Sequence, residues 1–353
     1  MRLCNNAILG LLLSAATALT LGAQQAPDKQ AASAAPSLTE DRDPVRSPDA
    51  EPGSTASGGP LHKEGEGYIL RTHVDEVVLN ASVIEGTHLV QDLTKDDFQV
   101  LEDGVKQTII SFQHTDLPVS IAMVVDNSGS MSRKRPAVNK SALDLIQASN
   151  PQDEAFVVNF SDEAYIDQEF TSDVNKLRDG LSHIESRGGT ALYDAVVASA
   201  DKLVADGKRP KQVLIIITDG EDNASTLSLE QTIRRVQQLS GPVIYSIGLL
   251  FGDEMTHSEV RHARRALEML SGETGGAAYF PKSIEQIDQI AAEVARDIRS
   301  QYTIGYHSTK PSSEPGFRHV EVKVQASGKG KMDVRTRTGY FPAARVAKKA
   351  QGQ

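Results

Sequence analysis

The residues best suited to chemistry in this chain are a carboxylate and two hydroxyls that follow an apolar stretch. Residues 119–125 are apolar apart from one serine. Asp126, Ser128 and Ser130 come next, each two positions from the last, so a curled turn can aim their side chains at one point. Mg²⁺ and Mn²⁺ prefer oxygen ligands in octahedral geometry, which makes this turn a candidate cation site.

Two further oxygen donors belong to separate loops. Thr190 follows a pair of glycines, and Asp219 follows a second apolar run over residues 213–218. We expect both loops to meet the Asp126 turn at one end of a parallel sheet. Two carboxylates balance the two charges of a cation and hydroxyls add none. The metal would therefore keep an open position that attracts one more anionic oxygen.

Each of these loops also has an ordinary explanation when it is taken alone. Ser and Asp after a strand often cap the next helix, and Asp-Gly is common turn chemistry. The three loops in this order, each at an expected element boundary, favour a shared metal site over three unrelated caps. Asp222 is better explained as a helix-start or solvated residue than as a further ligand.

In order and spacing, the candidate ligands resemble the metal-ion-dependent adhesion site of von Willebrand factor A domains. The five matching residues are Asp126, Ser128, Ser130, Thr190 and Asp219. The resemblance implies a Rossmann-like α/β domain that binds protein partners through Mg²⁺ or Mn²⁺, with Ca²⁺ as a third candidate. It also implies that an acidic side chain of the partner completes the coordination. The positions expected to form the partner-binding rim are Asn127, Met131, Gly189 and Gly220.

Around these loops the apolar pattern alternates between strands and helices. It predicts strands at 119–125, 155–160, 164–170, 213–218, 243–249 and 277–280. It predicts helices at 138–149, 174–184, 191–205, 229–239, 258–270 and 284–300. Such alternation is typical of a doubly wound, mostly parallel sheet, which places ligand sites at the carboxyl ends of its strands. Residues 164–170 are expected to fold back as an antiparallel edge.

The segments on either side of this region have the period-two alternation of β-strands. Residues 93–112 resemble the segment before the A domain in exported bacterial proteins best known from Acidobacteria. Residues 319–324 alternate cleanly, and residues 332–336 are expected to pair with them. Neither flank is large enough to fold alone. We therefore expect one accessory β-sandwich-like domain, with the A domain inserted between its halves.

The N-terminus has the pattern of an export signal. A positive start precedes an apolar stretch at 7–21 and a small-residue cleavage site, with an uncleaved membrane anchor as the alternative. Cys4, the only cysteine, precedes the apolar stretch, so the mature chain would lack disulfides. The location predicted is periplasmic, cell-envelope or secreted.

The sequence therefore divides into six expected segments. They are a signal peptide at 1–23, a disordered linker at 24–67, the first half of the accessory domain at 68–114, the A domain at 115–300, the second half at 301–342 and a flexible tail at 343–353. The linker is rich in Ala, Pro, Ser and Gly and has too few large apolar residues to form a core.

Composition and motifs argue against several other functions. The net charge of −10 does not suit phosphate binding, so no nucleic acid is expected as partner. An aspartyl phosphatase would need a second Asp where Ser128 stands. A serine hydrolase or a nucleotide hydrolase would need motifs that the chain lacks. We expect a protein that is not an enzyme.

The predicted function is metal-dependent binding of a protein that presents a carboxylate. The alternative is a structural component of an envelope complex, in which the metal only stabilises the fold. Arg133, Lys134 and Arg135 form a basic cluster beside the site. It is expected to be a solvated face, or else to attract an acidic partner. The oligomeric state stays open.

Overall fold

A computed structural model describes residues 76–342, apart from 149, 183–185, 240 and 252–254. The predicted signal peptide, linker and tail lie outside the described residues. None of the helices in this described part is both long enough and apolar enough to cross a bilayer.

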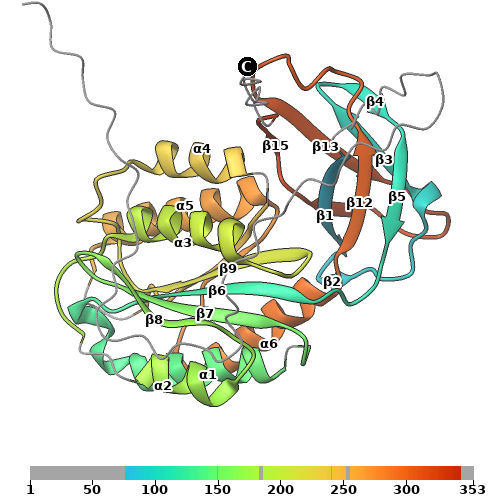
Figure 1. Cartoon of the computed structure of the whole chain (residues 1–353). Coiled ribbons are helices and arrows are strands. Elements are labelled where there is room, and N and C mark those ends of the chain that lie inside the picture. Colours follow the sequence, from blue (N-terminus) through green and yellow to red (C-terminus); the bar gives the residue numbers. More distant parts are fainter. Residues whose placement is uncertain (1–75, 149, 183–185, 240, 252–254, 343–353) are drawn as a thin grey trace, which may run out of the picture. The chain divides into compact units, whose positions relative to one another are not determined.

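The middle of the chain forms a six-stranded sheet in the order β11-β10-β9-β6-β7-β8 (Figure 1). Its strands are β6 (Val119–Asp126), β7 (Glu154–Phe160), β8 (Ala164–Thr171), β9 (Lys211–Thr218), β10 (Val243–Gly248) and β11 (Ala278–Tyr279). All neighbouring strands run parallel except β7 and β8, which are antiparallel. The doubly wound sheet with one antiparallel edge is therefore confirmed.

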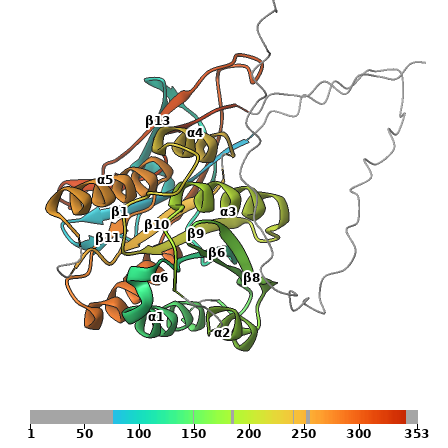
Figure 2. The same cartoon turned by 90° about the vertical axis from the view of Figure 1, so that its left-hand side faces the viewer.

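Helices cover both faces of this sheet (Figure 2). They are α1 (Arg135–Gln147), α2 (Val174–Ser182), α3 (Leu192–Asp206), α4 (Leu229–Leu239), α5 (His257–Thr274) and α6 (Ile287–Arg299). Short 3₁₀ turns are η1 (Lys95–Asp97), η2 (Gly129–Arg133) and η3 (Ile284–Gln286). One apolar core lies between the sheet and α1, α2 and α6, and a second lies between the sheet and α3, α4 and α5.

The unbroken apolar run of β6 follows from these two cores. Successive side chains of a strand point to opposite faces, so both faces must be apolar when both are covered. Met123 and Val125 enter the core beside α1, whereas Ala122 and Val124 enter the core beside α3. Every residue of β6 is buried, including the terminal Asp126.

The flanking segments form two further sheets, in the orders β14-β1-β12-β5 and β15-β13-β3-β4. Their strands are β1 (Glu76–Glu85), β2 (His88–Leu89), β3 (Phe98–Glu102), β4 (Val105–Gln107), β5 (Ile109–Gln113), β12 (Tyr302–His307), β13 (Arg318–Val324), β14 (Met332–Arg335) and β15 (Gly339–Tyr340). Strands from before and after the central region pair in both sheets and share one apolar core. The predicted accessory β unit thus forms from the two flanks together.

One predicted pairing is wrong. Residues 332–336 were expected beside residues 319–324, but β14 pairs with β1 in the other sheet. The reason is that β1 extends beyond its ladder with β12 and offers residues 82–85 as a free partner. β13 instead pairs with β3 over residues 320–324.

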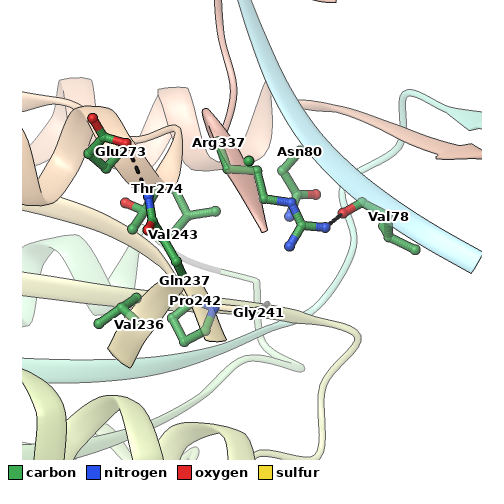
Figure 3. Close-up of a pocket in the computed structure, with 11 residues that line it drawn as sticks. Val78, Asn80, Val236, Gln237, Gly241, Pro242, Val243, Glu273, Thr274 and Arg337 are labelled. Atoms are coloured by element: carbon green, nitrogen blue, oxygen red, sulfur yellow. Dashed lines mark hydrogen bonds between the residues drawn. The ribbon is translucent and has the colours of Figure 1, made fainter. Parts of the chain in front are cut away.

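Polar contacts join the flanking sheets to the central region. The buried Asp297 carboxylate of α6 accepts hydrogen bonds from Ser82 Oγ at 2.7 Å and from Arg335 Nη2 at 2.9 Å. Arg337 donates to the carbonyl of Val78, beside a cavity of about 30 Å³ (Figure 3). A space of that size holds about one water molecule, so this junction is closely packed.

Lys211 should make the free energy of unfolding of this fold depend on pH in the alkaline range. Burial lowers the pKa of its ammonium to about 8, from an ordinary value of 10.5. Between these values the unfolded chain keeps a proton that the folded chain has lost, so the free energy of unfolding rises with pH. We expect a rise of about 1 kcal/mol between pH 8 and pH 9, measured by urea denaturation.

Lys211→Met should abolish that rise, because methionine does not titrate. Lys106→Met, at an exposed lysine of β4, is the matched control and should keep it. The measurement should stop near pH 9, because unfolded tyrosines begin to ionise above it and burial raises the pKa of Tyr245 and of several other tyrosines, which has the opposite effect. A flat profile in the wild-type chain would contradict the prediction.

Candidate functional site

The candidate site lies where β6 and β9 end side by side. The two strands are parallel neighbours, with Val125 opposite Ile217, so Asp126 and Asp219 emerge at the same edge of the sheet. The turn η2 follows β6, and the loop that carries Thr190 leads into α3. The three loops named from the sequence therefore converge at the carboxyl edge of the sheet.

Asp126 forms the buried floor of the site. Its Oδ1 accepts a hydrogen bond from the backbone N–H of Ser128 at 2.7 Å, and its Oδ2 accepts one from Thr218 Oγ1 at 2.5 Å. The side chain is fully buried. Burial raises the pKa of the Asp126 carboxyl, and the donors Ser128 and Thr218 oppose that rise.

A chain of oxygens joins the two loops above Asp126. Ser128 Oγ lies 3.1 Å from Ser130 Oγ, and Ser130 Oγ donates to Asp219 Oδ1 at 2.8 Å. The second oxygen of Asp219 accepts a hydrogen bond from Lys134 Nζ at 2.6 Å. The Asp219 carboxylate is thus buried and has a donor at each oxygen.

Thr190 is placed beside Asp219 by its own loop. Its N–H donates to Asn223 Oδ1 at 2.9 Å, and its carbonyl accepts from the N–H of Asn223 at 3.0 Å. The N–H of Gly189 donates to Asp162 Oδ1 at 2.7 Å. A Cβ at Gly220 would lie 3.4 Å from Thr190 Oγ1, so the hydroxyl borders the turn that follows Asp219.

Several of these residues line one pocket of about 240 Å³, called here the strand-end pocket. Ser130, Thr190 and Asp219 are called its polar end, and Glu221, Asp222, Asn223 and Glu259 also line it. Its apolar lining residues, called the apolar wall, are the half-exposed Leu250, Phe251, Met255 and Val260. The pocket therefore offers both oxygen ligands and an apolar surface.

The donor set fits a hard divalent cation. Hydrogen bonds link Asp126, Ser128, Ser130 and Asp219 in series, and Thr190 Oγ1 borders Gly220. Oxygen ligands of this kind suit Mg²⁺, Mn²⁺ and Ca²⁺. Within the described residues no group of three or more His, Cys, Asp or Glu could hold a metal by itself. A metal here would therefore depend on the serine and threonine hydroxyls. Two buried basic side chains oppose a cation here: Lys134 is bound to Asp219, and Arg135 lies 3.4 Å from the carbonyl of Asp126.

The expected rim is partly wrong. Met131 is fully buried in the core beneath η2, because the turn directs it inward, so it cannot contact a partner. Asn127 faces the neighbouring loop and accepts a hydrogen bond from Ser186 Oγ. Gly189 and Gly220 flank Thr190 as expected, and Gly220 lines the strand-end pocket.

Sequence reasoning also misplaced the basic cluster and missed two positioning residues. Arg135 and Lys134 are buried instead of solvated, and only Arg133 is exposed. The Asn223 amide and the Asp162 carboxylate hold the Thr190 loop, but nothing in their sequence spacing links them to it. Asp222 accepts a hydrogen bond from the N–H of Tyr193 at the start of α3, as expected of a helix-start residue, and it also lines the strand-end pocket.

Comparison with known proteins agrees with the fold and the order of the loops. Residues 121–221 match the family model described as the von Willebrand factor type A domain. The chain therefore contains a von Willebrand factor type A domain.

Among curated proteins, the chain is similar to the human inter-alpha-trypsin inhibitor heavy chain H4, with 26% identity over 214 residues, which covers 55% of this chain and 22% of that protein. It is 24% identical to human heavy chain H6 over 260 residues, which covers 67% of this chain and 20% of that protein. The chain thus spans about a fifth of the length of these relatives.

Two solved structures are similar at low identity. One is a von Willebrand factor type A protein from Catenulispora acidiphila, with 13% identity, a TM-score of 0.44, and coverage of 69% of this chain and 73% of that chain. The other is proximal thread matrix protein 1 from the mussel byssus, "with zinc occupied MIDAS motif". It has 17% identity and a TM-score of 0.43, and covers 57% of this chain and 50% of that chain.

Thr218→Val should destabilise the chain, because it removes a donor from the buried Asp126 carboxylate without changing the side-chain shape. We expect a loss of about 1–3 kcal/mol in the free energy of unfolding at pH 7, measured by urea denaturation. Thr232→Val in α4 is a matched control. The Thr232 hydroxyl is buried and has no hydrogen-bond partner among the described residues, so this change should be nearly neutral. Equal effects of the two changes would contradict the assigned hydrogen bond.

Proposed function

We propose that this chain is an exported, non-enzymatic adhesion module that binds a partner protein through a divalent cation. The residues that would hold Mg²⁺ or Mn²⁺, or Ca²⁺ as a third candidate, are Asp126, Ser128, Ser130, Thr190 and Asp219. The observation that carries the proposal is the continuous set of oxygens from Ser128 through Ser130 to Asp219 at one end of an open pocket. When bound, the cation supplies a Lewis-acidic position for one carboxylate oxygen of the partner.

The pocket also favours a particular neighbour for that carboxylate. The half-exposed Leu250, Met255 and Val260 line the same pocket as the polar end. An apolar side chain of the partner would be removed from water against them, which contributes affinity that a carboxylate alone lacks. The partner segment we propose therefore presents an acidic side chain beside a large apolar one.

The geometry argues against Asp126 as a nucleophile. Its two oxygens each accept a hydrogen bond, and its side chain has no exposed area. A nucleophilic serine would need an adjacent base. No histidine lines the strand-end pocket among the described residues. These facts support a binding role for the site over acyl or phosphoryl transfer.

Export is supported by the N-terminal sequence alone. The apolar stretch at 7–21 and the small residues after it favour a cleaved signal, and the Ala/Pro/Ser/Gly-rich residues 24–67 would tether the folded part. The partner would then be met in the periplasm, on the envelope or outside the cell.

Removal of the metal should eliminate partner binding and lower stability together. We expect Mg²⁺ or Mn²⁺ to raise the melting temperature of the full chain by a few degrees, reversibly with EDTA, since a ligand that binds only the folded state stabilises it. Asp219→Ala and Asp126→Ala should fold without this response. Asp144→Ala, at an exposed carboxylate of α1, is the control and should respond like the wild type.

Partner capture from envelope extracts separates this proposal from its alternative. Adhesion predicts a partner that is retained in Mg²⁺, released by EDTA and not captured by Asp219→Ala. A structural component of an envelope complex predicts the same partners in Mg²⁺ and in EDTA, with only the melting temperature changed. That second outcome would replace the adhesion proposal.

The apolar wall should contribute to the affinity for the partner and not to the affinity for the metal. Met255→Ser combined with Val260→Ser should lower the affinity for the captured partner by roughly tenfold or more, because each lost apolar contact is worth ~1–3 kcal/mol. Mn²⁺ affinity should stay at the wild-type value. Val105→Ser changes an exposed apolar residue of β4 and should alter neither quantity. Unchanged partner affinity in the double variant would remove the apolar wall from the site.

A further inference from the structure

Lys134 places a fixed positive charge on one of the proposed metal ligands. Its Nζ lies 2.6 Å from Asp219 Oδ2, and the side chains of Lys134 and Asp219 are 10% and 0% exposed. The residue follows η2 directly, and its ammonium also lies 5.4 Å from the centre of the Phe251 ring. The ammonium is therefore held between the polar end and the apolar wall of the strand-end pocket.

This ammonium changes the charge of the site. Asp126 and Asp219 contribute two negative charges, which a divalent cation alone would neutralise. Lys134 adds a positive charge directly beside Asp219, although Glu221, Asp222 and Glu259 also line the pocket and Arg135 lies near Asp126. Electrostatic effects are strong at buried positions, because little water screens them. A cation at Asp219 must therefore bind against the nearby ammonium.

The Lys134 ammonium also competes directly with a cation for the Asp219 carboxylate. Asp219 Oδ1 accepts a hydrogen bond from Ser130, a proposed ligand, and Oδ2 accepts one from Lys134, so a cation and the ammonium would share one carboxylate. A cation that withdraws electron density from the Asp219 carboxylate weakens the ion pair, and an anion bound in the pocket offers the ammonium a replacement partner.

We propose that Lys134 couples the two binding events of the strand-end pocket, so that the divalent cation binds weakly alone and tightly together with a carboxylate. This inference rests on the proposed function, because it concerns the same cation site. Coupling between two ligands is reciprocal, so the carboxylate raises the affinity for the cation by the factor by which the cation raises the affinity for the carboxylate. This coupling would keep the cation site largely empty until an acidic partner binds.

The test measures Mn²⁺ binding to the full chain, with free Mn²⁺ quantified by electron paramagnetic resonance, in the absence and presence of acetate. In the wild type, acetate should tighten Mn²⁺ binding roughly five- to tenfold, which is a typical size for coupling between two ligands. Lys134→Met should bind Mn²⁺ about tenfold more tightly without acetate, since a nearby positive charge is removed. It should lose most of the response to acetate.

Two control variants separate charge from packing. Lys134→Arg keeps the charge and should keep the acetate response. Lys140→Met removes a lysine of α1 that pairs with Asp144 and Asp288 outside the pocket, and should behave like the wild type. If Lys134→Met does not fold, Lys134→Gln takes its place with the same expectation.

The outcomes distinguish this inference from the proposal it rests on. Equal Mn²⁺ affinity and equal acetate response in the wild type and Lys134→Met overturn the role of Lys134 and leave the metal site intact. Failure of Mn²⁺ to bind the wild type and all Lys134 variants overturns the metal site itself. Loss of the acetate response in Lys134→Arg as well as Lys134→Met overturns the charge argument.

Discussion

The burial of two carboxylates at neighbouring strand ends is the constraint on which the rest of the site depends. Asp126 is 0% and Asp219 is 2% exposed, and removing an ionised carboxylate from water is costly unless donors replace the lost hydration. The donors are the Ser128 N–H, Thr218 Oγ1, Ser130 Oγ and Lys134 Nζ. Each carboxylate is therefore tied to two loops, which brings the separate loops to one place.

The sheet supplies the rigid frame for this arrangement. β6 and β9 are parallel neighbours joined by one hydrogen-bonded ladder and covered on both faces, so the strand ends that carry Asp126 and Asp219 are held side by side. The Thr190 loop has no strand beneath it and depends instead on Asn223 and Asp162. The flanking sheets connect at the other end of β6, through residues 114–118, so the strand-end pocket is left to the loops that follow the strands.

Patterns that act along a strand or within a turn were predictable. Residues 119–125 and 213–218 read as buried strands because both of their faces are apolar, and this holds in the structure. Asp126, Ser128 and Ser130 meet Asp219 because the parallel neighbours β6 and β9 end at one edge, whereas Thr190 joins them through the contacts of its own loop. Predictions failed where a side chain could point in either of two directions or a strand could pair with either of two partners. Met131 points into the core, and β14 pairs with β1 instead of β13.

The sequence by itself determined the doubly wound sheet, its antiparallel edge and the placement of Asp126 and Asp219 at neighbouring strand ends, because hydrophobic period and strand-end position are local properties. The five-residue metal site stays a prediction. Only the tertiary structure decided the electrostatics of the site. Three consecutive basic residues are equivalent in sequence, yet Arg133 is exposed, Arg135 is buried beneath the Asp126 carbonyl and Lys134 reaches Asp219. A helical turn rotates successive side chains by about 100°, and what each one meets depends on loops distant in the chain.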